Sequence, residues 1–174
     1  MKRTLAALFL ALVVALVGTI GVAGAKPPHN FTTGGGKVVT TLIPDSTRVE
    51  KFAFSAHAIG STTVARNGHF VYEQTLTQPV VRLELKGRVA CVRVVENGAS
   101  FVGLIEKSNE SNLVGSFASF YVVDNDQPHG NGADPDQFLF GGILGSPTCS
   151  LPGPGNPLNS GNIVSTTPSR CLKV

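Results

Sequence analysis

The sequence lacks tryptophan altogether, and its only methionine is the initiator Met1. Charged residues make up only 14% of the chain, and Lys and Arg form no cluster after Lys2-Arg3. Nucleic-acid binding needs clustered cations that neutralise phosphates, so this distribution argues against a nucleic-acid partner. The missing tryptophan weighs against a carbohydrate-hydrolysing site, where large aromatic side chains usually line the substrate.

Catalytic signatures are missing as well. The sequence contains no His-Glu-x-x-His, Cys-x-x-Cys, Gly-x-Ser-x-Gly or phosphate-loop pattern. It therefore predicts a protein that is not an enzyme. A hydrolase that uses Asp134 and Asp136 as paired carboxylates is the weakest hypothesis, because such residues are common in turns.

The first 25 residues have the layout of a cleavable export signal. Two cations at positions 2–3 precede an apolar run over residues 5–17, and Ala23-Gly24-Ala25 follows. This order predicts a helical signal peptide cleaved after Ala25. An uncleaved anchor needs about 20 apolar residues, and the glycines after position 17 disfavour it. We therefore expect a secreted, extracellular protein with no stable membrane anchor after cleavage.

Cleavage would change the size and charge of the chain. Removing 25 of the 174 residues leaves 149, which is the size of one ordinary domain. The 14 basic residues become 12 against 11 acidic ones, so the net charge falls from +3 to +1.

The mature sequence has the pattern of an all-β protein. Phe52, Phe54 and Ala56 alternate with polar residues, as in a half-buried strand. Further short runs of this kind are separated by Gly, Pro and Asn, which favours an antiparallel sandwich or barrel of about eight strands. The expected layout is a signal peptide (1–25), an extended lead-in (26–36), a β domain (37–144) and a Pro/Gly-rich tail with a closing strand (145–174).

Two local signals refine this arrangement. Asn97-Gly98 lies between two apolar runs and predicts a hairpin with these two residues at its turn, because both tolerate positive φ. Gly87 lies within a long alternating stretch and predicts a bulge or a join between two strands.

Three cysteines remain after export, namely Cys91, Cys149 and Cys171. An exported chain with three cysteines is expected to form one disulfide. A Cys149–Cys171 bond would close the tail locally, whereas a Cys91–Cys149 bond would attach the tail to the sheet. The sequence leaves both pairings open.

The most polar stretch of the chain runs from residue 124 to residue 136. It contains Asp124, Asp126, Asp134 and Asp136, and calcium takes six to eight oxygen ligands of this kind. The spacing is not that of an EF-hand. Asp, Asn, Gly and Pro are also the residues that turns use, so an ordinary turn is the main alternative to a calcium site.

Several short motifs between residues 34 and 165 suggest a family resemblance. In chain order they are Gly34-Gly35-Gly36, Phe52-Ala53-Phe54, Gly68-His69-Phe70-Val71-Tyr72, Gly87-Arg88-Val89-Ala90-Cys91-Val92, Val95-Glu96-Asn97-Gly98-Ala99, Val122-Val123-Asp124-Asn125-Asp126-Gln127-Pro128, Asp134-Pro135-Asp136-Gln137-Phe138 and Gly161-Asn162-Ile163-Val164. This order resembles a group of small secreted β-domain proteins that are frequent in actinobacteria. The resemblance implies a secreted β domain and implies no activity. The chain departs from the group's pattern at Cys171.

These observations support three hypotheses of function. The first is a non-enzymatic secreted module that binds a protein or a glycan through its loops, as rigid β scaffolds often do. The second is a small-ligand carrier with an apolar barrel cavity lined by Phe52, Phe54, Phe70 and Leu83. The third is a surface domain stabilised by calcium at residues 124–136.

Overall fold

The protein is a single antiparallel β-sheet that curls on itself. The computed structural model describes residues 29–43, 46–59, 67–125, 134–149 and 155–166. Nine strands and one short 3-10 turn make up these residues. The strands are β1 (His29–Ile43), β2 (Ser46–Ile59), β3 (Asn67–Thr77), β4 (Val80–Val95), β5 (Gly98–Ser108), β6 (Phe117–Val123), β7 (Gln137–Leu144), β8 (Asn156–Pro157) and β9 (Ser160–Thr166), and the turn η1 (Ser111–Leu113) lies between β5 and β6.

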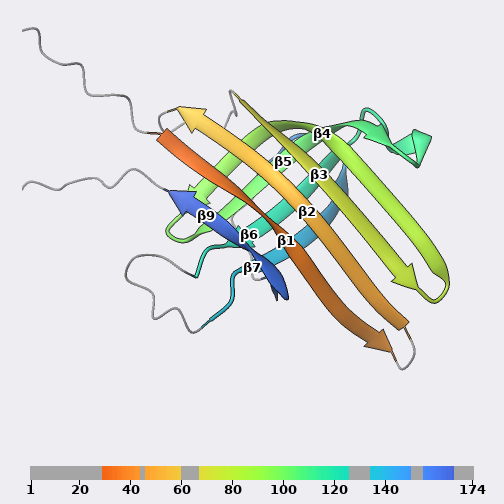
Figure 1. Ribbon diagram of the computed structural model, residues 1–174. Coiled ribbons are helices and arrows are strands. Elements are labelled where there is room, and N and C mark those ends of the chain that lie inside the picture. Colours follow the sequence, from red (N-terminus) through yellow and green to blue (C-terminus); the bar gives the residue numbers. More distant parts are fainter. Residues whose placement is uncertain (1–28, 44–45, 60–66, 126–133, 150–154, 167–174) are drawn as a thin grey trace, which may run out of the picture.

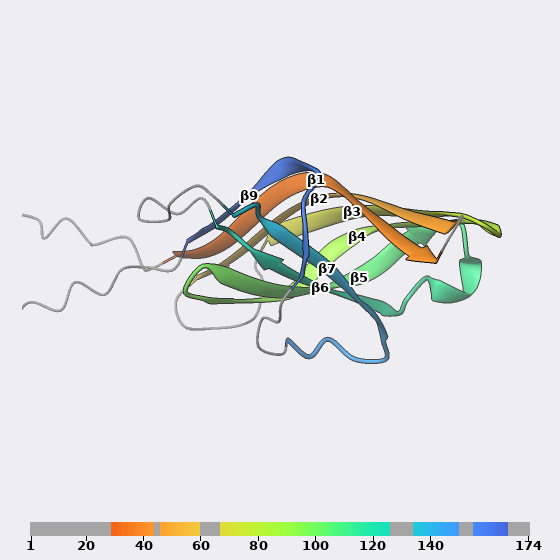
Figure 2. The same cartoon turned by 90° about the horizontal axis from the view of Figure 1, so that it is seen from below.

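The strands follow the order β8-β7-β6-β5-β4-β3-β2-β1-β9 across the sheet. Chain neighbours from β1 to β7 therefore pair as a meander, and only β9 returns to the far edge to pair with β1 (Figure 1). The sheet curls so strongly that β5, β6 and β7 lie beneath β1, β2 and β3 (Figure 2). The expected all-β, antiparallel barrel-like fold is confirmed, in the form of a half-barrel made of one sheet.

Aromatic rings fill the interior of the curl. The side chains of Phe52 and Phe54 on β2 are buried, as the alternation predicts. The Phe52 ring stacks on Phe138 with 3.8 Å between ring centroids, and Phe54 lies 4.6 Å from Phe101. Because aromatic pairs of this kind add packing energy to their buried area, the two walls of the curl hold each other in place.

Two glycines, Gly103 and Gly34, allow neighbouring strands or rings to pack closely against the backbone. A Cβ atom on Gly103 would lie 2.3 Å from the Phe70 ring, and one on Gly34 would lie 2.6 Å from the carbonyl oxygen of Asn162 on β9. Neither position has room for a side chain. The glycine run in β1 thus lets β9 pack closely against it, and the run belongs to a paired strand.

Two buried aspartates close the curl. Asp124 directly follows β6, and Asp136 directly precedes β7. Each residue is at most 5% exposed. Asp136 Oδ2 accepts a hydrogen bond from the backbone N–H of Ile163 at 2.6 Å, and Asp124 Oδ2 accepts one from Ser165 at 2.8 Å. Both donors lie on β9, at alternate positions of the edge that does not pair with β1. The carboxylates therefore link the two ends of the sheet.

The structure also corrects two details of the sequence-based layout and confirms a third. Residues 29–36, expected as an extended lead-in, are part of β1 and pair with β2 and β9. The hairpin around residues 97–98 is present, but its turn residues are Glu96 and Asn97, and Gly98 pairs with Val95. Glu96 takes the positive φ of 54°. With the turn at this position, the carbonyl of Asn97 accepts the N–H of Asp124 at 2.8 Å. The bulge expected at Gly87 is confirmed by a register shift between Lys86 and Gly87.

The closing carboxylates make a testable prediction. Asp136 accepts two backbone N–H groups, from Asn125 at Oδ1 and from Ile163 at Oδ2. Asp136→Asn leaves only one acceptor oxygen, so one buried N–H loses its partner, at a cost of about 1–3 kcal/mol. We expect urea unfolding to show this loss in the free energy of unfolding. Asp134→Asn, at an exposed position, is the control. An equal loss of stability in both variants would contradict the role of Asp136 as an acceptor of buried amides.

Candidate functional site

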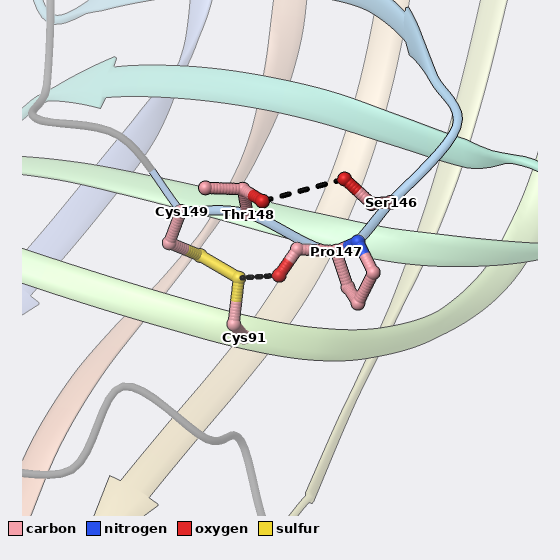
Figure 3. The surroundings of a disulfide bond; sticks show 5 residues. All are labelled: Cys91, Ser146, Pro147, Thr148 and Cys149. Atoms are coloured by element: carbon pink, nitrogen blue, oxygen red, sulfur yellow. Dashed lines mark hydrogen bonds between the residues drawn. A yellow bond between two sulfur atoms is a disulfide. The ribbon is translucent and has the colours of Figure 1, made fainter.

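A covalently attached strap crosses the outer face of the sheet. Residues 145–149 leave β7 and run back over β6 and β5 to reach β4, where Cys149 forms a disulfide with Cys91 (Figure 3). A tight turn shapes the strap, because the N–H of Thr148 donates to the carbonyl of Ser146 at 3.0 Å. Of the two pairings that the sequence left open, the structure contains Cys91–Cys149. Cys171 lies outside the described residues.

The strap covers apolar residues that face away from the interior. Val102 lies directly opposite Cys91 in the β4–β5 ladder and so faces outward, yet it is only 2% exposed. The carbonyl oxygen of Pro147 lies 3.6 Å from Cys91 Sγ. We read this approach as a van der Waals contact, since a disulfide sulfur carries no proton to donate. The sheet is therefore covered on both faces at this point.

A cleft opens along one side of the strap. Its volume is about 470 Å³, within the usual range of roughly 300–1,000 Å³ for ligand pockets. Among the described residues, apolar side chains dominate its walls, and the only charged one is an arginine. The lining residues are Asn67, Gly68, Arg88, Val89, Ala90, Leu104, Phe117 and Pro147.

The elements around the cleft explain its shape. Arg88, Leu104 and Phe117 are consecutive cross-strand partners on β4, β5 and β6 and share the outer face. The strap supplies Pro147 from above. Arg88 Nε donates to Glu106 Oε1 at 2.5 Å, and these two side chains are 70% and 42% exposed. An ion pair this exposed stabilises the fold little, so the guanidinium remains available to an anionic group of a partner.

A second, smaller cleft of about 290 Å³ lies at the far end of β4 and β5. Lys86 and Lys107 are direct cross-strand partners there, and Glu84 lines the same space. Charges of both signs share this surface, and the Asn109 side chain binds the backbone of Arg82 and Glu84. We consider this cleft a solvated polar surface, since its charges offset one another.

A polar cluster around Glu50 lies in the described interior, and sequence analysis missed it. Glu50 is 2% exposed, and its Oε1 accepts the Tyr72 hydroxyl at 2.6 Å. Arg48 Nε lies 3.4 Å from Glu50 Oε2, and Gln74 Oε1 lies 2.9 Å from the same hydroxyl. Burial raises the pKa of Tyr72 above its usual range, and the negative charge of Glu50 raises it further. Tyr72 therefore stays a neutral donor that stabilises a buried carboxylate.

The four carboxylates considered as calcium ligands have different surroundings. The oxygens of Asp124 and Asp136 face backbone amides of β9, whereas Asp134 is exposed. Asp126 lies outside the described residues. Within the described ranges, no group of three or more His, Cys, Asp or Glu side chains converges on a metal-sized space. A calcium ion bound by all four stays a prediction, and calcium-dependent thermal melting tests it.

The sequence of β5 contains one signal of the outer cover, because its residues do not alternate between apolar and polar. Phe101, Val102, Gly103, Leu104 and Ile105 contain no polar residue at all, so neither face of this strand is suited to water. Such a run indicates that both faces are covered. The sequence could not show that a segment more than 40 residues later in the chain supplies the outer cover.

Comparisons with known proteins found no match. No family model, no curated protein and no solved structure is significantly similar to this chain. The expected cleavage position at Ala25 lies outside the described residues. In the part of the chain that the structure describes, no helix has the length and apolarity needed to cross a bilayer.

The disulfide that holds the strap should be a large contributor to stability. It joins residues 58 positions apart, and closing a loop of this size is worth about 4 kcal/mol in the chain-entropy model. We expect the double variant Cys91→Ala, Cys149→Ala to lose stability of that order in urea unfolding. Cys171→Ala is the matched control, and a loss of similar size in the control would contradict this pairing.

The interior cluster can be tested by a double-mutant cycle. Tyr72→Phe removes the hydroxyl that Glu50 accepts, which should cost about 1.5–3 kcal/mol because the acceptor is charged and buried. Glu50→Gln on its own should also destabilise. The two changes together should cost less than their sum, since they remove one shared interaction. Additive losses would show that the two side chains do not depend on each other.

Proposed function

We propose that the protein is an exported, non-enzymatic β module that binds a protein or glycan partner at the cleft beside its strap. The cleft of about 470 Å³ on the outer face is the observation that carries this proposal. Its described lining offers apolar contact, one arginine and one asparagine amide. Such a lining suits recognition, because it places an orienting cation beside apolar side chains.

The disulfide supports both the location and the binding role. Disulfides persist in oxidising compartments, so the Cys91–Cys149 bond supports an extracellular protein. The bond also fixes one wall of the cleft to β4 before any partner arrives. A preformed wall lowers the entropy lost on binding.

The packing of the interior favours the outer cleft over an internal carrier site. Three of the four residues that would line an internal cavity, Phe52, Phe54 and Phe70, contact other aromatic rings. Ring centroids 3.8 Å to 5.1 Å apart leave no space between those rings for a ligand. A carrier would therefore need a rearranged core, whereas the outer cleft needs none.

A cleft-filling variant tests the proposal. The secreted protein would first be screened against arrays of glycans and of peptides to find ligands. Ala90→Phe places a ring in the cleft, so it should weaken a true ligand by at least about tenfold, or 1.4 kcal/mol. Val81→Phe, on the same strand but outside the cleft, should bind as the parent does. Ligands that bind both variants equally would refute the cleft as the binding site.

A further inference from the structure

Charge is unevenly distributed over the two faces of the sheet. Phe52, Tyr72 and Leu85 are consecutive partners on β2, β3 and β4, and their buried side chains face the interior. Residues one position away face outward, because successive side chains of a strand point to opposite faces. On the cleft side of the strap, the outward positions of the described chain include six exposed cations, namely Lys37, Lys51, Arg82, Lys86, Arg88 and Lys107.

Fewer carboxylates share this surface. In the described chain they are Glu73, Glu84 and Glu106, so six cations face three carboxylates and the local net charge is +3. Two of these carboxylates are already bound, because Arg82 Nη2 lies 2.8 Å from Glu84 Oε1 and Arg88 Nε donates to Glu106. Three further carboxylates are buried and bind groups of the protein itself, namely Glu50, Asp124 and Asp136.

Four of the cations form two pairs of lysines. Lys37 lies directly opposite Lys51 in the β1–β2 ladder, and Lys86 lies directly opposite Lys107 in the β4–β5 ladder. Glu73, which is opposite Lys51 on its other side, offsets part of the first pair. Within the described chain, none of the four lysines forms an ion pair. Like charges in direct opposition destabilise a sheet, so an anion that bridges a pair removes a repulsion as well as gaining an attraction.

A strip of short side chains connects the two pairs. The row of cross-strand partners Gly35, Ala53 and Val71 crosses β1, β2 and β3 and ends at Lys86. The pairs are separated by three strand spacings of about 4.8 Å and by two residues of about 3.4 Å along the strands, which places their centres roughly 16 Å apart. A ligand that reaches both pairs is therefore extended.

We infer that the partner is an acidic polysaccharide, with one sugar in the cleft, an acid group on Arg88 and further acid groups on the two lysine pairs. This inference rests on the proposed function and narrows the partner to one class. A chain of sugars suits the strip, because its hydroxyls keep their water there while its acid groups meet cations. Exposed ion pairs are individually weak, and several of them along one chain add up to measurable affinity.

Other anionic macromolecules fit this surface less well. Single-stranded nucleic acid gains much of its affinity from bases that stack on aromatic rings, and the described residues of the strip include no aromatic one. A protein would place its apolar anchor in the cleft and leave Lys37 and Lys51 at the rim of the interface. Charges at a rim affect the association rate more than the affinity.

Labelled oligosaccharides test the inference on the full protein with its disulfide intact. The acidic probes are an oligomer of galacturonic acid, which carries carboxylates, and dextran sulfate, which carries sulfates. The methyl-esterified oligomer and plain dextran are their uncharged controls. We expect saturable binding of at least one acidic probe in fluorescence polarisation, weakened by added salt, and at least about tenfold weaker binding of its control. Failure of both acidic probes to bind would overturn the inference.

Charge-matched variants locate the binding on the sheet. Lys86→Gln with Lys107→Gln lowers the net charge by two, and so does Arg93→Glu, which changes an exposed residue of β4 beyond the disulfide. We expect the double variant to bind the acidic probe about tenfold more weakly and Arg93→Glu to bind it like the parent. Equal weakening by both would indicate unspecific attraction and contradict the inference. Thermal melting verifies that these exposed changes leave the fold intact.

The more distant lysine pair separates a polysaccharide from other anions. Lys37→Gln with Lys51→Gln should also weaken the acidic probe about tenfold, because an extended chain uses both pairs. Poly-glutamate and oligo-thymidylate of similar length serve as the protein and nucleic-acid probes. Tighter binding of either one than of both acidic sugars would show that the partner class is wrong.

The cleft-filling variant distinguishes failure of this inference from failure of the proposed function. If Ala90→Phe blocks ligands that none of the lysine variants affects, the inference is wrong and the proposed function holds. If no ligand, acidic or neutral, responds to Ala90→Phe, the proposed function itself is wrong.

Discussion

Two carboxylate side chains complete what the backbone of this sheet leaves unfinished. A sheet closes into a barrel when its first and last strands pair, and here β9 and the β6–β7 end meet through Asp124 and Asp136 instead. Charged acceptors form stronger hydrogen bonds to backbone amides than neutral carbonyls do. Two side chains can therefore join strands whose backbones do not pair. The same contacts bind two outward amides of β9, Ile163 and Ser165, which would otherwise be open to pairing with other chains.

This mode of closure has consequences for the interior. Because the two walls are held so close, rings from β2, β3, β5, β6 and β7 stack directly on one another, and the buried carboxylate of Glu50 accepts the Tyr72 hydroxyl among them. The packed rings leave no space between them for a ligand. The strap shapes the outer surface instead, since it covers part of the outer face of β4–β6, and a cleft lies at its margin.

The sequence predicts those features that depend on local pattern. The alternation in β2, the bulge at Gly87 and the hairpin before β5 each follow from side-chain period or glycine conformation, and the structure confirms them to within a residue. The sequence could not predict features that depend on contacts between residues far apart in the chain. Nothing in the composition of residues 124–136 distinguishes oxygens that bind a cation from oxygens that accept backbone amides. Cysteine spacing likewise could not choose between two pairings, and Arg48, Glu50 and Tyr72 meet only because β2 and β3 pair in one register.

The edge of β9 shows how side chains of the same molecule can close a sheet. The outward amides of Ile163 and Ser165 are bound by aspartate oxygens, so these two groups are not offered to another extended chain. An open edge is an aggregation hazard when it is flat and uncharged. Because the two carboxylates reduce that hazard at β9, the surface that we propose for binding lies elsewhere, on the outer face. There the disulfide between Cys91 and Cys149 fixes one wall of the cleft.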